Sequence, residues 1–257
     1  MAYEQTVRAL RDIHETDPSY PSSLEYHESL VDYTRLLSKR SPIEPLHTAS
    51  EALLLAANAQ HVARWKRPRA DYPLGLTGYK LWRTALNKFH ADLLHETMLE
   101  SGYSADRDAA LFARTRDLLL KRTLQRPPLP HDVALLRDPE AHLFEDAICL
   151  TFLARDFAAF AAEYHAPPPT DAPPQTDARD TESTRALRAG GTDKLKTIVS
   201  RTWAKMTSQG RQVAVEQLVG TLDEDLRNVV IEAVGACEKQ EDEQRATATG
   251  SSETKTA

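Results

Sequence analysis

The chain has few of the residues that build secreted or membrane-spanning proteins. It contains only two cysteines in 257 residues, Cys149 and Cys237, which excludes a disulfide framework and favours a reducing compartment. No apolar run approaches the roughly 20 residues that are needed to cross a bilayer. The first residues, M-A-Y-E-Q-T-V-R-A-L-R-D, are charged and lack the apolar stretch of a signal peptide. We therefore expect a cytoplasmic protein without membrane contact.

The charge balance argues against a protein that binds nucleic acid over a broad surface. Charged residues make up 27% of the chain, and the formal net charge is −6 at pH 7. A net negative charge gives no bulk attraction to a phosphate backbone, so affinity for phosphate has to come from a local basic cluster. A small anionic molecule is therefore the expected partner, and nucleic acid ranks well behind it.

Strand-type alternation of β-branched residues is missing, and almost every periodic segment has helical spacing. The sequence therefore predicts an all-α helical bundle. Its helices are expected at about 2–15, 23–38, 50 to just before Pro68, 79–101, 105–124, 140–164, 193–206 and 209–237. The helix at 140–164 is apolar almost all round, which is typical of a helix at the centre of a bundle.

Composition divides the chain into four parts. Residues 1–165 are expected to form the main helical domain, which would contain the functional site. Residues 166–191 are rich in Pro, Thr, Asp and Gly and read as a flexible linker or insertion. Residues 192–237 predict C-terminal helices that pack on the main domain, and the polar residues 238–257 predict a disordered tail.

Two histidines and two carboxylates are candidates for a metal centre. His61 lies where an apolar helical stripe meets a basic end, and His90 lies on the next predicted helix. Glu145 and Asp146 are flanked by apolar residues of the 140–164 helix, where a buried carboxylate without a partner costs several kcal/mol. Imidazole and carboxylate suit Zn, Fe or Mn, so His61, His90 and Asp146 are candidate ligands and Glu145 and Asp146 candidate catalytic groups. The alternative is a buried Asp–Arg or Asp–His pair that locks the bundle.

A basic and aromatic patch surrounds the two histidines in the sequence. Arginine forks bind phosphate or carboxylate in bidentate fashion, and aromatic rings stack on bases or cover guanidinium groups. A charge run at the end of a helix can also be a solvated face that complements the helix dipole. The candidate ligand-binding residues are Arg64, Trp65, Arg67, Arg69, Tyr72, Tyr79, Trp82 and Arg83.

Four segments resemble a family known only as domain of unknown function 4202. They are S-E-A-L-L-L-A-A-N-A-Q-H-V-A-R-W-K-R-P-R-A-D-Y-P, G-Y-K-L-W-R-T-A-L-N-K-F-H-A, F-E-D-A-I-C-L-T-F-L and K-L-K-T-I-V-S-R-T-W-A-K-M-T. Together the resemblance covers about residues 3–235. The family pattern usually has an arginine where this chain has Leu76-Thr77, and L-E-D-V where this chain has Phe144-Glu145-Asp146-Ala147.

Three functions remain open at this point. The first is a metal-dependent hydrolase of a small phosphorylated or nucleotide-like substrate, distantly similar to the helical HD-type phosphohydrolases. The second is a non-catalytic helical module that binds an anionic ligand, either a nucleotide or an RNA segment. The third is an interaction scaffold whose ion pairs only hold helices together. No tight ligand spacing such as H-E-x-x-H decides between them.

Overall fold

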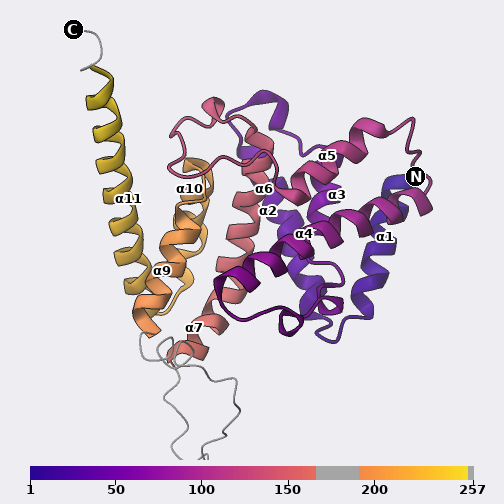
Figure 1. Cartoon of the computed structure of the whole chain (residues 1–257), viewed down its shortest axis with the longest axis horizontal. Helices are drawn as coiled ribbons and strands as arrows, with labels where there is room; N and C mark the ends of the chain where they lie inside the picture. Colours follow the sequence, from indigo (N-terminus) through magenta and orange to yellow (C-terminus); the bar gives the residue numbers. More distant parts are fainter. Residues whose placement is uncertain (166–190, 254–257) are drawn as a thin grey trace, which may run out of the picture. The chain divides into compact units, whose positions relative to one another are not determined.

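The computed structural model describes residues 1–165 and 191–253, and these residues contain helices but no strand. The all-α prediction is therefore confirmed (Figure 1). The predicted insertion at 166–191 falls, except for its last residue, outside the described residues. The helices are α1 (Ala2–Glu15), α2 (Ser22–Arg40), α3 (Glu51–Ala59), α4 (Gly75–Glu100), α5 (Ala109–Leu120), α6 (Pro139–Thr151), α7 (Phe157–His165), α9 (Gly191–Trp203), α10 (Ser208–Gln217) and α11 (Glu224–Glu253).

Contacts within the chain define two compact units. Among the described residues, the first comprises 1–125, 130–151 and 207–210, and the second comprises 126–129, 152–165, 191–206 and 211–253. The second unit has its own hydrophobic core, in which α9 packs against α7 and α11. Its buried residues are Phe157, Ala161, Leu195, Val199, Leu226, Val229, Val230 and Ala233.

The first unit is built around two short apolar helices, α3 and α6. Helix α3 contacts α1, α2, α4, α5 and α6, and its side chains are small or aliphatic and mostly buried. Helix α6 packs mainly along α2, and every residue from Ala141 to Thr151 is buried. The prediction that this nearly all-apolar helix is central and buried is thus confirmed for this part. A π-helical stretch, Phe152–Asp156, then interrupts the single helix that was expected to reach residue 164.

Local signals set several of the helix ends. The side chain of Ser50 accepts a hydrogen bond from the backbone N–H of Leu53 and so caps the start of α3, as expected. Gly102 adopts φ +98° after α4, and the N–H of Tyr103 donates to the carbonyl of Met98. This left-handed glycine turn ends α4, because residues with a Cβ rarely adopt that conformation.

The C-terminal segment differs most from its prediction. Residues 209–237 form two helices, α10 and α11, with a short turn between them at Val219–Thr221. Helix α11 then continues through the expected disordered tail to Glu253. The residues just after 237, E-K-Q-E-D-E-Q-R-A, are mostly strong helix formers, so their intrinsic propensity extends the helix although they carry no apolar stripe.

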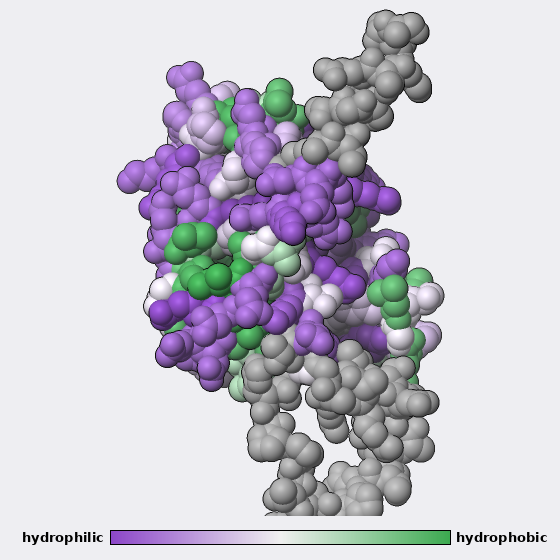
Figure 2. All heavy atoms as spheres, turned by 90° about the vertical axis from the view of Figure 1, so that its left-hand side faces the viewer, coloured by the Kyte–Doolittle hydropathy of each residue, from purple (hydrophilic) through white to green (hydrophobic). Residues whose placement is uncertain are grey.

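The exposed surface is mainly polar. The face drawn in Figure 2 is largely hydrophilic, and hydrophobic residues gather on it only in small separate groups. Within the described ranges, none of the helices combines the length and the apolar character that crossing a membrane requires.

Candidate functional site

The chain leaves the helical conformation directly after α3, which places His61 in a strained turn. Gln60 has ψ 120°, and both His61 (φ 72°) and Ala63 (φ 53°) adopt left-handed conformations. The expected helix to Pro68 therefore ends at Ala59. Residues with a Cβ adopt this conformation at a cost of roughly 1–2 kcal/mol, and such positions concentrate at functional sites. The turn directs the histidine back toward the neighbouring helices.

Four histidines from different segments meet in the first unit. The rings of His61, in this turn, and His90, on α4, have centroids 5.9 Å apart. The rings of His14, on α1, and His27, on α2, have centroids 3.8 Å apart. Tyr26 stacks on His61 at 5.1 Å. Both ring nitrogens of His14 and His90, the Nδ1 atom of His27 and the Nε2 atom of His61 are shielded from solvent and have no hydrogen-bond partner, which is a costly arrangement unless something else occupies the site.

Burial keeps these four imidazoles uncharged. It lowers the pKa of His14 to about 4 and that of His90 to about 3. Burial is also the main reason that the pKa values of His27 and His61 lie well below the usual value. His14 and His90 both lower the pKa of His27, and His27 in turn lowers that of His61, so the four rings form one electrostatically coupled group.

Two arginines act on the inner pair of histidines. Arg64 and Arg83 both lower the pKa of His61 and of His90, so the charges of two guanidinium groups act on two neutral imidazoles. Arg83 is half-buried, and it forms no ion pair or hydrogen bond within the described residues. Gln60 is 1% exposed, and neither its amide nitrogen nor its amide oxygen has a partner. We call Gln60, His61, Arg64, Arg83 and His90 the imidazole–arginine cluster.

The other predicted ligand-binding residues mostly hold the loop between α3 and α4. Arg69 donates to the carbonyl of Tyr72 at 2.9 Å, and the indole N–H of Trp82 donates to the carbonyl of Arg67 at 2.8 Å. The guanidinium of Arg67 lies 5.3 Å from the centroid of the Phe89 ring. These contacts brace the loop from within.

Three further residues of the basic and aromatic patch, Arg64, Tyr79 and Trp82, are linked by ring contacts. The guanidinium of Arg64 lies 4.9 Å from the centroid of the Trp82 ring, and the Tyr79 and Trp82 rings are 5.9 Å apart. Trp82 is buried and Tyr79 is about half exposed. Trp65 is partly buried. Of the eight candidates, Arg64 and Arg83 are those whose charges act on His61 and His90.

The two candidate acids have partners of their own. Asp146 is 1% exposed, and it accepts hydrogen bonds from the backbone N–H of Thr207 at 2.8 Å and from its hydroxyl at 2.5 Å. Thr207 precedes α10, and its hydroxyl oxygen accepts from the N–H of Gly210. Glu145 forms an ion pair with Lys121, which follows α5 in a left-handed conformation. Both acids thus tie α6 to other segments of the first unit.

Asp146 and the histidine group lie near different parts of α2. Gln209, two residues after Thr207, donates to the carbonyl of Leu37 near the C-terminal end of α2. His27 lies ten residues earlier on the same helix, which corresponds to about 15 Å along the helix axis. Within the described residues, no three His, Cys, Asp or Glu side chains are grouped in a way that could hold a metal ion. The expected ligand set of His61, His90 and Asp146 is therefore not assembled.

Sequence reasoning missed Gln60, His14 and His27 as members of the buried polar group. Both histidines occupy helical positions next to isoleucine or tyrosine, and nothing in a single sequence distinguishes an inward histidine from an exposed one there. Gln60 carried a signal that could have been used. Gln60 precedes His61 and follows a mostly apolar segment. If the helix continued through Gln60, its polar amide would be buried without an obvious partner.

The fold and the cluster together define an all-helical protein with a buried polar site between its N-terminal helices. Residues 4–230 match the family described as a domain of unknown function, DUF4202, and the chain belongs to that family. None of the curated proteins and none of the solved structures that were compared with the chain matches it.

Proposed function

We propose that the protein binds a small phosphorylated molecule at the imidazole–arginine cluster. The observation that supports this most strongly is Arg83, a half-buried arginine without an ion-pair or hydrogen-bond partner in the described residues that lies beside two neutral histidines. A phosphate group would supply the missing negative charge and accept hydrogen bonds from the guanidinium fork.

The electrostatic surroundings of the cluster favour an anion. The charged groups with the largest effects on the pKa of His61 and His90 are arginines and other histidines. No carboxylate is among them. Neutral imidazoles each offer one N–H donor and one acceptor nitrogen. Together with the Gln60 amide they provide directional donors for phosphate oxygens, while Arg64 and Arg83 supply charge.

The test is a comparison of ligand binding by the wild type and by Arg83→Gln. We expect inorganic phosphate, ribose 5-phosphate or AMP to raise the melting temperature of the wild type, whereas ribose should not. Calorimetric titration with the best of these ligands should show binding that is about 10 to 100 times weaker in Arg83→Gln, because a charge-assisted hydrogen bond is lost.

Lys88→Gln serves as the matched control, because Lys88 is an exposed cation on the same helix, α4. It should bind the phosphorylated ligand like the wild type. If Arg83→Gln and Lys88→Gln weaken binding equally, or if no phosphorylated ligand stabilises the wild type, the proposed site is refuted.

Metal-dependent hydrolysis is the second candidate, and the unpartnered ring nitrogens favour it. Neutral imidazoles are the form that binds Zn, Fe or Mn, and His27, His61 and His90 are the side chains that would hold such an ion. Because no three such groups are arranged for coordination, these side chains would have to rotate first. For this reason, metal-dependent hydrolysis is less well supported than the binding of a phosphorylated molecule.

Elemental analysis of the purified protein separates these two candidates. If the hydrolase account holds, the wild type should carry close to one equivalent of a transition metal after supplementation, and His90→Ala should lose it. A content below about a tenth of an equivalent in the wild type would exclude that account. Phosphate binding would be unaffected by that result.

A further inference from the structure

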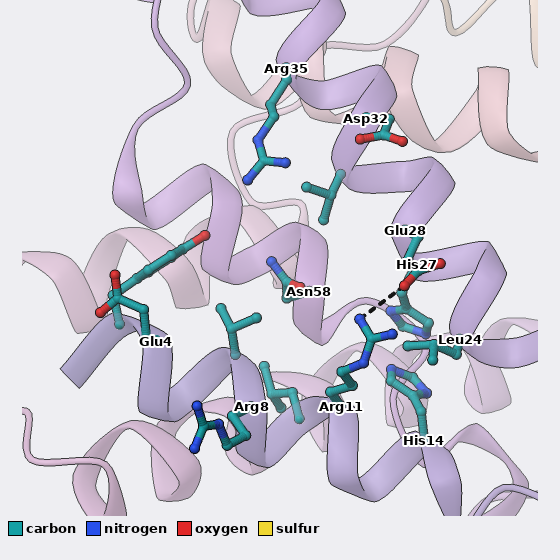
Figure 3. Close-up of a pocket in the computed structure, with 14 residues that line it drawn as sticks. Glu4, Arg8, Arg11, His14, Leu24, His27, Glu28, Asp32, Arg35 and Asn58 are labelled. Atoms are coloured by element: carbon teal, nitrogen blue, oxygen red, sulfur yellow. Dashed lines mark ion pairs between the residues drawn. The ribbon is translucent and has the colours of Figure 1, made fainter. Parts of the chain in front are cut away.

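A cavity opens between α1, α2 and α3 (Figure 3). Its volume is about 570 Å³, which is within the range of small-molecule pockets. His14 and His27 line it, as do the aliphatic side chains Val7, Leu10, Leu24 and Val31. All of its lining residues belong to the first unit.

The two histidines line this cavity with three ring nitrogens that have no hydrogen-bond partner. His14 is 1% exposed and His27 is 4% exposed. Both ring nitrogens of His14 and the Nδ1 atom of His27 lack a hydrogen-bond partner. Such atoms cost free energy when they are buried, and a bound molecule with its own donors and acceptors would satisfy them.

The charged residues around the cavity balance one another. Three arginines and three acids line it: Arg8, Arg11, Arg35, Glu4, Glu28 and Asp32. Arg11 pairs with Glu28 at 2.9 Å, and Arg35 hydrogen-bonds Tyr3. The side chains of Arg8, from α1, and Asp32, from α2, are exposed and form no ion pair or hydrogen bond within the described residues (Figure 3). One cation and one anion on different helices therefore remain available to a ligand.

We infer that this cavity binds a short peptide with free termini, whose carboxylate faces Arg8 and whose ammonium group faces Asp32. Arg8 and Asp32 line the cavity from different helices, so a molecule with opposite charges at its two ends complements them. The aliphatic wall takes the side chains, and the two imidazoles contact the backbone amides. A balanced rim disfavours a polyanion, which distinguishes this cavity from the imidazole–arginine cluster.

The experiment is a calorimetric titration with the tripeptide Ala-Leu-Ala in three forms: free, N-acetylated and C-amidated. The wild type should bind the free form about ten times more tightly than the acetylated or the amidated form. Acetylation removes the contact of the ammonium group, and amidation removes the contact of the carboxylate. Asp32→Asn should bind the free and acetylated forms equally. Arg8→Gln should bind the free and amidated forms equally.

Asp12→Asn is the matched control, because Asp12 is an exposed acid on α1 that does not line the cavity. It should keep the full preference for free termini. The inference is overturned if no form binds at millimolar concentration, if the blocked forms bind as well as the free form, or if Asp12→Asn changes binding as much as Asp32→Asn. None of these results bears on phosphate binding, which Arg83→Gln tests separately.

Discussion

Replacing Asp146 with alanine is expected to lower the free energy of unfolding by about 3 kcal/mol. The buried carboxylate holds the N–H and the hydroxyl of Thr207, and its removal leaves both donors unsatisfied inside the first unit. It also releases the segment that leads into α10. Urea unfolding of the wild type and the variant, followed by far-UV circular dichroism, measures the difference.

Asp132→Ala is the control for this prediction. Asp132 accepts one hydrogen bond from the N–H of Ala134 at an exposed site, so its removal should cost no more than about 1 kcal/mol. An Asp146→Ala protein as stable as the wild type, but without ligand binding or catalysis, would contradict the structural role. It would return Asp146 to the list of candidate catalytic residues.

The second large effect is a loss of stability in mild acid. His14 titrates at about pH 4 and His90 at about pH 3 in the folded protein, compared with about 6.5 in an unfolded chain. The unfolded state therefore binds more protons below pH 6.5, and the free energy of unfolding falls as the pH falls. Each such imidazole contributes up to about 1.4 kcal/mol per pH unit until its folded pKa is reached.

Denaturant unfolding at pH values between 7 and 4 tests this dependence. We expect a combined loss of several kcal/mol over that range, and a shallower slope in His14→Leu, which removes one of the buried imidazoles. The histidine effect is separable from that of Asp138, whose pKa is lowered to about 2, because the contribution of Asp138 is lost only below about pH 4. A stability that is constant between pH 7 and 4 would show that the buried histidines are already protonated or become exposed.

The helices could be predicted from the sequence because each has its own local signal. Apolar spacing located α1, α2 and α6, and Ser50 and Gly102 marked one helix start and one helix end. The turn at His61 and Ala63 could not be predicted in this way. Left-handed backbone is normally indicated by glycine or asparagine, and neither residue is of these types, so only tertiary packing imposes the conformation.

The candidate site was predicted in part for a related reason. His61, Arg64 and Arg83 became candidates because they lie close together in the sequence, and the charges of both arginines do act on His61 and His90. The acids at 145 and 146 were added because burial requires a partner, and that reasoning was sound. The identity of the partners, Lys121 and Thr207, depends on how distant segments meet, which spacing within one helix cannot reveal.

The central claim, that phosphate binds beside His61 and His90, is tested most directly by NMR of ¹⁵N-labelled imidazoles during a titration with phosphate. The signals of His61 and His90 should move with saturation behaviour, while the exposed His131 should not respond. In Arg83→Gln the same movement should require a much higher concentration. If the His61 and His90 signals stay fixed while phosphate binds elsewhere, or if all histidines respond alike, the account is contradicted.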